Sequence, residues 1–125
     1  INELAKFVDD NEIHNDHILL VRYCKTILNK GNFKYIYVTM GEKGGVLVGR
    51  EDSAQFIPVF GGEAVDITGA GDATLAAIAV AVAAKADIVN AVNFASRVAG
   101  ISVSKAGTAA VTKSEVISFV YDKIT

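Results

Sequence analysis

The chain has 125 residues, of which 51% are hydrophobic and 21% charged, and its formal net charge is -2. This composition predicts a folded domain with a packed core and argues against disorder. The twelve Lys and Arg residues are scattered, so no nucleic-acid partner is expected. The strongest apolar stretch, residues 73–84, is too short to cross a membrane, and early acids argue against a signal peptide. A single cysteine, Cys24, excludes an internal disulfide and fits a cytoplasmic protein.

The first thirty residues predict two helices. Residues 1–9 are expected to form a short amphipathic helix. Either Asn15 or Asp16 can cap a second helix that runs to about Lys30, because both side chains accept hydrogen bonds from the first N–H groups of a helix. The apolar residues of this helix recur at helical spacing and predict a buried face that includes Cys24 as a structural thiol. The glycine that follows Lys30 is expected to end the helix.

Three strands are expected next. Residues 35–40 are rich in β-forming side chains and almost uncharged, which predicts a buried strand. A glycine-rich turn at 41–45 leads to two further strands, 46–48 and 55–59. A glycine pair at 61–62 opens a loop that leads toward residue 72.

The rest of the chain is mostly helical. One helix is expected at 73–85, and Asp87 is expected to cap another at 87–103. Thr112 and Glu115 have the spacing of a capping box before a last helix, 116–123. This order predicts an α/β architecture with helices packed on a small sheet. Because the chain starts in a helix and has few strands, it looks like the second half of a larger fold.

The run Gly69-Ala70-Gly71-Asp72 directly precedes the long apolar helix. Glycines let the backbone approach a ligand, and a helix start offers unpaired N–H groups and partial positive charge to an anion. An ionised Asp72 beside an acceptor hydroxyl can take its proton during attack on a γ-phosphate. The run therefore predicts phosphoryl transfer. The alternative is that Asp72 only caps the helix and the glycines only make a turn.

Two other glycine-loop sites do not fit the sequence. A dinucleotide fingerprint requires G-x-G-x-x-G directly after a strand, but Thr74 occupies the third glycine position. A Walker A loop requires Gly-Lys-Ser/Thr, but Lys43 is followed by Gly44. The Lys43 side chain is long enough to reach a phosphate. We nevertheless prefer to interpret it as a solvated residue of the turn.

Two histidines and a second acid are further candidates for chemistry. His14 and His17 stand three residues apart, but a metal needs three or four ligands and only acids such as Asp16 lie nearby. The two histidines are interpreted as polar residues at a helix start. Asp66 precedes Asp72 by six residues, so the two carboxylates also allow an acid–base pair.

Four segments together resemble the ribokinase (PfkB) family of carbohydrate kinases, and they cover nearly the whole chain. Residues 66–72 resemble its C-terminal signature. Residues 38–45 are similar to the strand and turn that approach the nucleotide, and residues 99–109 to the helix and loop that close around adenine. Residues 2–4 resemble the end of the family's Asn-x-x-Glu motif.

Within the family, residues 73–76 and 103–112 are most similar to the heptose-phosphate kinases of lipopolysaccharide core synthesis. Many other relatives have Phe and Gly where this chain has Ala73 and Ala76. That departure weakens an assignment to ribokinase itself.

The resemblance implies the C-terminal portion of a ribokinase-like three-layer α/β/α fold. Residues 1–125 would be its nucleotide-binding part, with the N-terminal half absent. The implied activity is ATP-dependent phosphoryl transfer to a sugar or sugar-phosphate hydroxyl, most like that of D-glycero-D-manno-heptose 7-phosphate kinase. The implied partner is a small-molecule sugar phosphate, and the resemblance allows a homodimer formed through the parent protein. These residues alone are expected to be inactive, and the alternative function is a non-catalytic nucleotide-binding module.

The resemblance also assigns roles to single residues. Asp72 would be the catalytic base, and the N–H groups of Gly69, Ala70 and Gly71 would form the anion hole. The residues expected to contact ATP are Thr39, Gly41, Gly44, Asn93, Lys105 and Gly107.

Two cation sites are implied in the same way. Asp66 and Thr68, with carbonyls near Ser102, Lys105 and Gly107, would match the monovalent-cation site of many members, which suggests K⁺. Glu3 would act near Mg²⁺, which bridges phosphates and offsets the charge of ATP.

Overall fold

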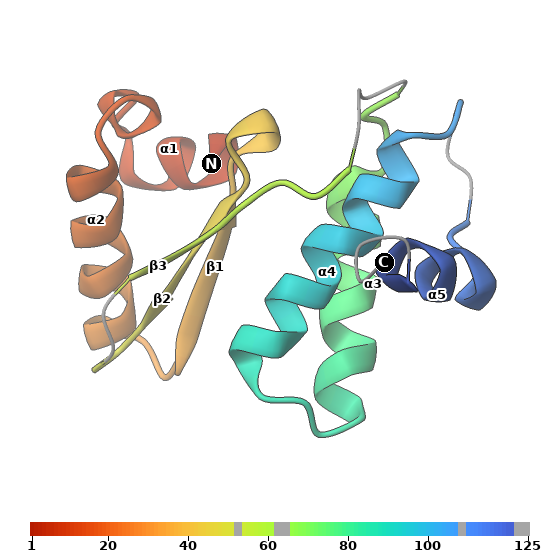
Figure 1. The fold of residues 1–125 in the computed structure, drawn as a ribbon. Coiled ribbons are helices and arrows are strands. Elements are labelled where there is room, and N and C mark those ends of the chain that lie inside the picture. Colours follow the sequence, from red (N-terminus) through yellow and green to blue (C-terminus); the bar gives the residue numbers. More distant parts are fainter. Residues whose placement is uncertain (52–53, 62–65, 108–109, 122–125) are drawn as a thin grey trace. The chain divides into compact units, whose positions relative to one another are not determined.

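A computed structural model describes residues 1–51, 54–61, 66–107 and 110–121 (Figure 1). The chain divides into two compact units, Ile1–Ile57 and Pro58–Thr125. Each unit has a hydrophobic cluster of its own. Among the described ranges, no helix is long and apolar enough to cross a membrane.

The first unit contains the two helices and three strands that the sequence predicts, together with two short 3₁₀ helices that it does not. The order is α1 (Asn2–Val8), η1 (Glu12–His14), α2 (His17–Lys30), β1 (Tyr35–Thr39), η2 (Gly41–Lys43), β2 (Gly45–Gly49) and β3 (Gln55–Ile57). The strands form an antiparallel sheet in the order β1-β2-β3. The predicted α/β architecture is therefore confirmed in this unit.

Helix α2 begins at Asp16 and not at Asn15, which settles the alternative left open by the sequence. The Asp16 carboxylate accepts hydrogen bonds from the backbone N–H groups of Ile18 and Leu19, both at 2.9 Å. The helix ends at Gly31 as predicted, although this glycine is extended rather than left-handed. The Arg50 guanidinium donates to the carbonyl of Gly31 at 2.7 Å and so ties the helix end to the strand that follows β1.

The buried strand is β2, and the prediction of a buried strand at 35–40 is wrong for most of that segment. All of β2 is buried, whereas Tyr35 of β1 is 41% exposed and Thr39 is also exposed. The reason is position in the sheet, because β2 lies between its two neighbours and β1 lies at one side. Strand β3 is shorter than predicted because Pro58 has no N–H to continue the ladder.

The core of the first unit lies between α2 and the sheet. The buried face of α2 has the predicted helical spacing, and Cys24 on this face is completely buried. Burial raises the pKa of the Cys24 thiol to about 11, which keeps it protonated and unreactive and supports its interpretation as a structural residue. The members of this core are Ala5, Ile13, Leu20, Cys24, Leu28, Val38, Met40, Val46 and Val48.

The second unit consists of α3 (Ala70–Ala83), α4 (Ile88–Val103) and α5 (Lys113–Tyr121). Helix α4 packs along α3 and also contacts α5 (Figure 1). The Asp87 carboxylate caps α4 by accepting the Asn90 N–H at 3.0 Å, as predicted. Helices α3 and α5 each begin three residues earlier than predicted, at Ala70 rather than Ala73 and at Lys113 rather than Val116.

The early start of α5 follows from its capping box. The Thr112 N–H donates to the Glu115 carboxylate at 2.7 Å, and the Glu115 N–H returns a hydrogen bond to the Thr112 hydroxyl at 3.4 Å. In such a box the first residue is the cap itself, so the helix begins immediately after it. The box is confirmed, and only the helix boundary drawn from it was wrong.

Residues 58–61 pack on α4 and contact three of its residues. The Ser96 hydroxyl donates to the Pro58 carbonyl at 2.7 Å, and the Arg97 guanidinium stacks 4.6 Å from the centre of the Phe60 ring. A Cβ on Gly100 would lie 1.7 Å from the Phe60 carbonyl oxygen, so only glycine allows this approach. This contact fixes where the chain enters the second unit.

The substitution Gly100→Ala tests this contact. The new methyl group clashes with backbone rather than with a mobile side chain, so we expect a loss of about 1–3 kcal/mol in the free energy of unfolding. Urea denaturation measures the change. The matched control is Gly71→Ala, a helical glycine whose added Cβ meets no atom within 4 Å, and its stability should not fall. Equal effects of the two substitutions would contradict the described approach of residues 58–61 to α4.

Candidate functional site

The N-terminus of α3 presents unpaired backbone N–H groups. Gly69 caps the helix in a left-handed conformation, with φ 79°. Ala70 donates its N–H to the Ile67 carbonyl at 3.2 Å, but the N–H groups of Gly69, Gly71 and Asp72 have no partner in the described part of the chain. Of the three donors predicted for the anion hole, Gly69 and Gly71 thus have no partner among the described residues, and Ala70 is engaged in a turn. The Asp72 N–H is an additional free donor that sequence reasoning missed.

The Asp72 carboxylate is exposed in the first turn of α3. It makes no hydrogen bond or ion pair with any residue that the structure describes. Gly69 occupies the capping position, and no side chain caps the helix. The interpretation of Asp72 as a simple helix cap is therefore wrong, and its carboxylate is available to a ligand.

Gly71 is unusual among the glycines of the chain because neither its backbone nor its packing requires a glycine. Its φ is not positive, and a Cβ at this position would meet no atom within 4 Å. Gly41 and Gly107, two other predicted site glycines, also face open space, but both have positive φ, of 58° and 71°. A missing side chain at Gly71 leaves room beside the free N–H groups of α3.

The Asp66 carboxylate joins the loop before α3 to the loop after α4. One of its oxygens accepts the Thr68 N–H at 2.8 Å, and the other accepts the Gly107 N–H at 3.1 Å. Hydrogen bonds from the Thr68 side chain, the Thr68 amide and the Gly107 amide hold the pKa of Asp66 below its usual range. Asp66 is therefore ionised and hydrogen-bonded to neighbouring backbone. This does not favour Asp66 as the protonated acid of an acid–base pair with Asp72.

Asp66 and Thr68 carry oxygen ligands of the kind that hard cations prefer. A carboxylate has about four lone-pair sites, so two accepted N–H groups leave Asp66 able to bind a cation as well. These two residues therefore fit the predicted monovalent-cation site. Across the described ranges, no group of three or more His, Cys, Asp and Glu residues could hold a metal ion.

Lys105 binds its own loop rather than projecting from it. Its amine lies 2.6 Å from the Glu115 carboxylate and 2.8 Å from the Ala110 carbonyl. The ion pair joins the loop after α4 to the capping box of α5. Sequence reasoning missed it, because residues ten apart across a loop have no periodic pattern that would indicate contact.

Asn93 and Gly107 belong to different parts of the second unit. The Asn93 amide donates to the Val89 carbonyl one turn earlier in α4, at 2.9 Å, which fixes the direction of its side chain. Gly107 lies in the loop that Asp66 holds. Both are predicted ATP contacts, and both are fixed in position by these hydrogen bonds.

The remaining predicted site residues lie in the first unit. Thr39 ends β1, and Gly41 and Gly44 belong to the η2 turn, which closes through a 2.7 Å hydrogen bond from the Met40 N–H to the Gly44 carbonyl. The Glu3 side chain is 94% exposed, with its carboxylate 3.8 Å from the amino group of Ile1.

His17 and Lys43, the candidates for a metal and a phosphate site, have other partners in the structure. The His17 ring packs on Phe56 with 5.2 Å between ring centroids, and the Lys43 amine lies 3.4 Å from the His14 carbonyl. Neither contact indicates a metal or phosphate site.

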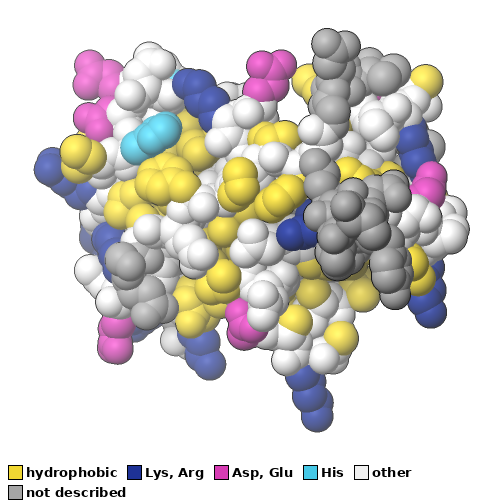
Figure 2. Space-filling view, viewed as in Figure 1, with side chains coloured by type: hydrophobic (Ala, Val, Ile, Leu, Met, Phe, Trp, Pro, Cys, Tyr) yellow, Lys and Arg dark blue, Asp and Glu magenta, His cyan; other side chains and the backbone are white. Residues whose placement is uncertain are grey.

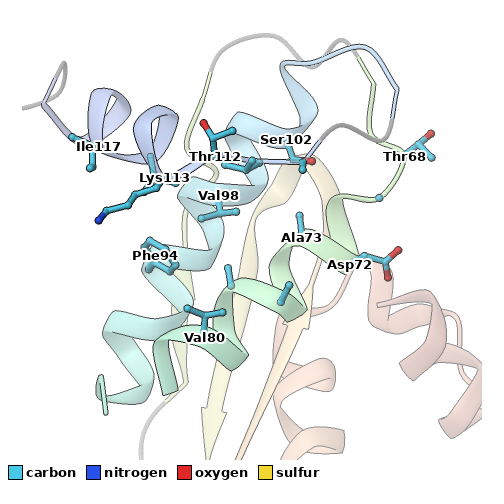
Figure 3. Close-up of a pocket in the computed structure, with 16 residues that line it drawn as sticks. Thr68, Asp72, Ala73, Val80, Phe94, Val98, Ser102, Thr112, Lys113 and Ile117 are labelled. Carbon is cyan, nitrogen blue, oxygen red and sulfur yellow. The ribbon is translucent and has the colours of Figure 1, made fainter. Parts of the chain in front are cut away.

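A pocket of about 760 Å³ lies beside Asp72, bounded by α3, α4 and the start of α5. Its walls are mostly apolar. Figure 3 shows Phe94 and Val98 of α4 and Val80 of α3 around it, with Asp72 at the start of α3. Sequence reasoning missed this pocket because its walls come from three helices whose mutual packing is not encoded in local spacing.

The geometry defines a site with free helix N–H groups, an available carboxylate and a neighbouring oxygen cluster, on an α/β chain. The family model for pfkB family carbohydrate kinases matches residues 1–115 of this chain. The chain belongs to this family. The suggested family resemblance is thereby confirmed.

Named relatives agree with this assignment. The chain is 39% identical over 98 residues to the bifunctional protein HldE of Shewanella sp. strain ANA-3, an alignment that covers 78% of this chain and 21% of that protein. It is also similar to ribokinase from Thermotoga maritima, with 32% identity, a TM-score of 0.75 and coverage of 81% of this chain and 34% of that one.

Phosphofructokinase-2 from Escherichia coli, solved in complex with potassium, shares the fold. Its TM-score is 0.81 at 21% identity, with coverage of 96% of this chain and 38% of that one. These likenesses confirm the predicted ribokinase-like fold. The chain spans about a fifth of the length of the curated relatives it matches.

The ion pair at Glu115 predicts a pH-dependent stability. The Lys105 amine, with hydrogen bonds from the Thr112 amide and hydroxyl, lowers the pKa of Glu115 from 4.5 to about 2. A lowered acid pKa stabilises the folded state fully above the unfolded value, and this contribution is lost as the pH falls toward the folded value. The stability difference between wild type and Glu115→Gln should thus be largest above about pH 5 and vanish near pH 2.

Urea unfolding between pH 2 and 7 measures that difference. The control is Ser118→Ala on the same helix, because Ser118 is exposed and does not titrate. A Glu115→Gln difference that stays constant with pH would contradict the ion pair.

Proposed function

We propose that these residues form the C-terminal nucleotide-binding part of a cytoplasmic kinase that transfers a phosphoryl group from ATP to a sugar or sugar-phosphate hydroxyl. The observation that carries the proposal is the available Asp72 carboxylate in the first turn of α3, next to free N–H groups. Membership of the pfkB family supports the same reaction class.

In the proposed reaction, Asp72 acts as the general base. Its carboxylate takes the proton of the acceptor hydroxyl as that oxygen bonds to the γ-phosphorus of ATP. The bond from that phosphorus to the bridging oxygen breaks, and ADP leaves with the electron pair. The N–H groups at Gly69, Ala70 and Gly71 stabilise the charge on the transferred group, and the hydrogen bond of Ala70 to Ile67 makes it the weakest of the three donors.

The residues that the family resemblance assigns to ATP are proposed to contact the nucleotide. Thr39, Gly41 and Gly44 bind its phosphates and ribose, and Asn93 with the loop 105–107 borders adenine. The open space at Gly41 and Gly107 and the fixed conformation of the 105–107 loop support these roles.

Two cations are proposed to assist. Glu3 would help to hold Mg²⁺, and the metal would supply positive charge that offsets the charge of ATP. A monovalent cation, K⁺, binds at Asp66 and Thr68, whose oxygen ligands suit it. The potassium complex of the Escherichia coli phosphofructokinase-2 supports this assignment by analogy of fold.

The proposed acceptor is a heptose phosphate, D-glycero-D-manno-heptose 7-phosphate, of the pathway to ADP-heptose and the lipopolysaccharide core. The similarity of residues 73–76 and 103–112 to heptose-phosphate kinases supports it, as does the 39% identity to HldE. Most acceptor contacts are proposed to lie outside residues 1–125, so this chain alone is expected to give no sugar-dependent turnover.

The substitution Asp72→Asn tests the base in the complete kinase. We expect kcat to fall by a factor of about 10²–10⁴, with the Kd for Mg-ATP changed only a few-fold, because Asn keeps the shape but cannot take the proton. A coupled ADP-release assay and calorimetry give the two values. Asp87→Asn, at the cap of α4, is the matched control and should retain activity. Near-normal turnover by the Asp72→Asn protein would exclude the base assignment.

The substitution Gly71→Ala tests the phosphate contact separately from folding. The described structure leaves room for the methyl group, so stability should stay equal or rise by about 0.5 kcal/mol. The same methyl group would occupy the space of a phosphate, so the affinity for Mg-ATP should fall at least about tenfold, or about 1.4 kcal/mol. Unchanged ATP affinity at unchanged stability would show that phosphates bind elsewhere.

A further inference from the structure

The loop that follows α4 is held to the segment before α3 by Asp66. The Asp66 N–H donates to the Val103 carbonyl at 3.1 Å, and the Asp66 carboxylate accepts the Gly107 N–H at 3.1 Å. Gly107 itself has a φ of 71°, a left-handed conformation that glycine adopts readily. These contacts fix the loop at its start and at Gly107.

The same loop is held to the start of α5 by an ion pair. The Lys105 amine lies 2.6 Å from Oε1 of Glu115, and it donates to the Ala110 carbonyl five residues further along the chain at 2.8 Å. The Lys105 side chain is 22% exposed and the Glu115 side chain 36%. A partly buried pair is screened less by salt than a fully exposed one, so this contact persists at physiological ionic strength.

The two carboxylate oxygens of Glu115 have separate partners. Oε1 contacts Lys105, whereas Oε2 accepts hydrogen bonds from the N–H and the hydroxyl of Thr112, both at 2.7 Å. The capping box therefore orients the carboxylate on the backbone of α5, independently of Lys105. Glu115 is a fixed acceptor for the lysine rather than one of two mobile side chains.

We propose that Glu115 is a positioning residue for the nucleotide, which acts by holding Lys105 and thereby the conformation of the loop 105–107. This inference rests on the proposed kinase function, in which that loop borders adenine. The Lys105 amine already has two oxygen partners, so it sets the conformation of its own loop rather than supplying charge to a phosphate. Glu115 needs no contact with the nucleotide for this role.

Preorganisation is the physical basis of the effect. A mobile loop loses conformational freedom when a ligand binds to it, and this loss weakens the affinity. The Lys105 contacts order the loop before the nucleotide arrives, so part of that cost is removed. The proposed phosphate donors at Gly69 and Gly71 belong to another segment, the start of α3. Breaking the ion pair should therefore weaken the binding of the base and leave the binding of phosphates intact.

Charge alone predicts the opposite result for the removal of Glu115. ATP is an anion, so the replacement of a carboxylate by a neutral amide strengthens its binding through long-range electrostatics. Figure 2 shows Lys and Arg side chains dispersed over the visible face, without a basic patch there that would dominate this comparison. Weaker binding of ATP after Glu115→Gln thus indicates a change in the loop and not in the net charge.

Calorimetric titration of the complete kinase tests the inference. Glu115→Gln keeps an oxygen for Thr112 but loses the charge that holds Lys105. The Kd for Mg-ATP should rise about tenfold, whereas the Kd for Mg-tripolyphosphate, which has no base, should change less than about twofold. In turnover assays KM for ATP should rise with kcat nearly unchanged, because the loop does not touch the reacting atoms.

A second variant breaks the same contact from its other end. Lys105→Met leaves the capping box of α5 in place, so it remains informative if Glu115→Gln does not fold. It should show the same selective loss of Mg-ATP affinity. The double variant should lose no more affinity than either single one, because both substitutions remove one shared interaction.

The matched control is Thr112→Ala, which removes the capping hydroxyl but retains the Thr112 N–H and the pair of Lys105 with Glu115. It should lower the melting temperature without changing the Kd for Mg-ATP. Equal affinity losses in Thr112→Ala and Glu115→Gln would show a merely structural role and overturn the inference. Unchanged or tighter Mg-ATP binding by Glu115→Gln, or an equal loss for tripolyphosphate, would also overturn it.

These outcomes are separate from failure of the proposed function. A wild-type protein that binds neither Mg-ATP nor Mg-tripolyphosphate would refute both the proposed function and this inference. If wild type binds Mg-ATP and Asp72→Asn abolishes turnover, but Glu115→Gln binds normally, only the inference is refuted.

Discussion

The second unit depends on the carboxylate of Asp66. One oxygen accepts the Thr68 N–H and the other the Gly107 N–H, so a single side chain joins the loop that enters α3 to the loop that leaves α4. The ion pair of Lys105 with Glu115 extends this connection to the start of α5. Two acids and one lysine therefore connect the loop before α3, the loop after α4 and the start of α5.

Local chemistry predicted much of this structure, and the failures have physical causes. Asp16, Asp87 and the Thr112–Glu115 box were recognisable because a capping side chain acts within three residues of its own position. The start of α3 was placed too late because glycine disfavours helix interiors, although Gly71 in the first turn is tolerated there. The exposure of β1 depends on the order of the strands in the sheet. The Lys105–Glu115 ion pair depends on the conformation of a loop. Neither can be predicted from the spacing of residues along the sequence.

The N-terminus of helix α3 offers backbone donors and the Asp72 carboxylate, and further along the helix the exposed side chains, such as Leu75 and Val80, are apolar. The chain belongs to the pfkB family and aligns with about a third of two related folds.

The most direct measurement is an amide ¹H–¹⁵N spectrum of the chain titrated with Mg-ATP and, separately, with adenosine. The account predicts that the amide resonances of Gly69, Gly71 and Asp72 shift with Mg-ATP and not with adenosine, because these free N–H groups bind phosphate. Ala70, whose N–H already donates to Ile67, should respond less. Shifts confined to residues away from the start of α3, or equal responses to adenosine, would contradict the central claim that this helix terminus binds the phosphates.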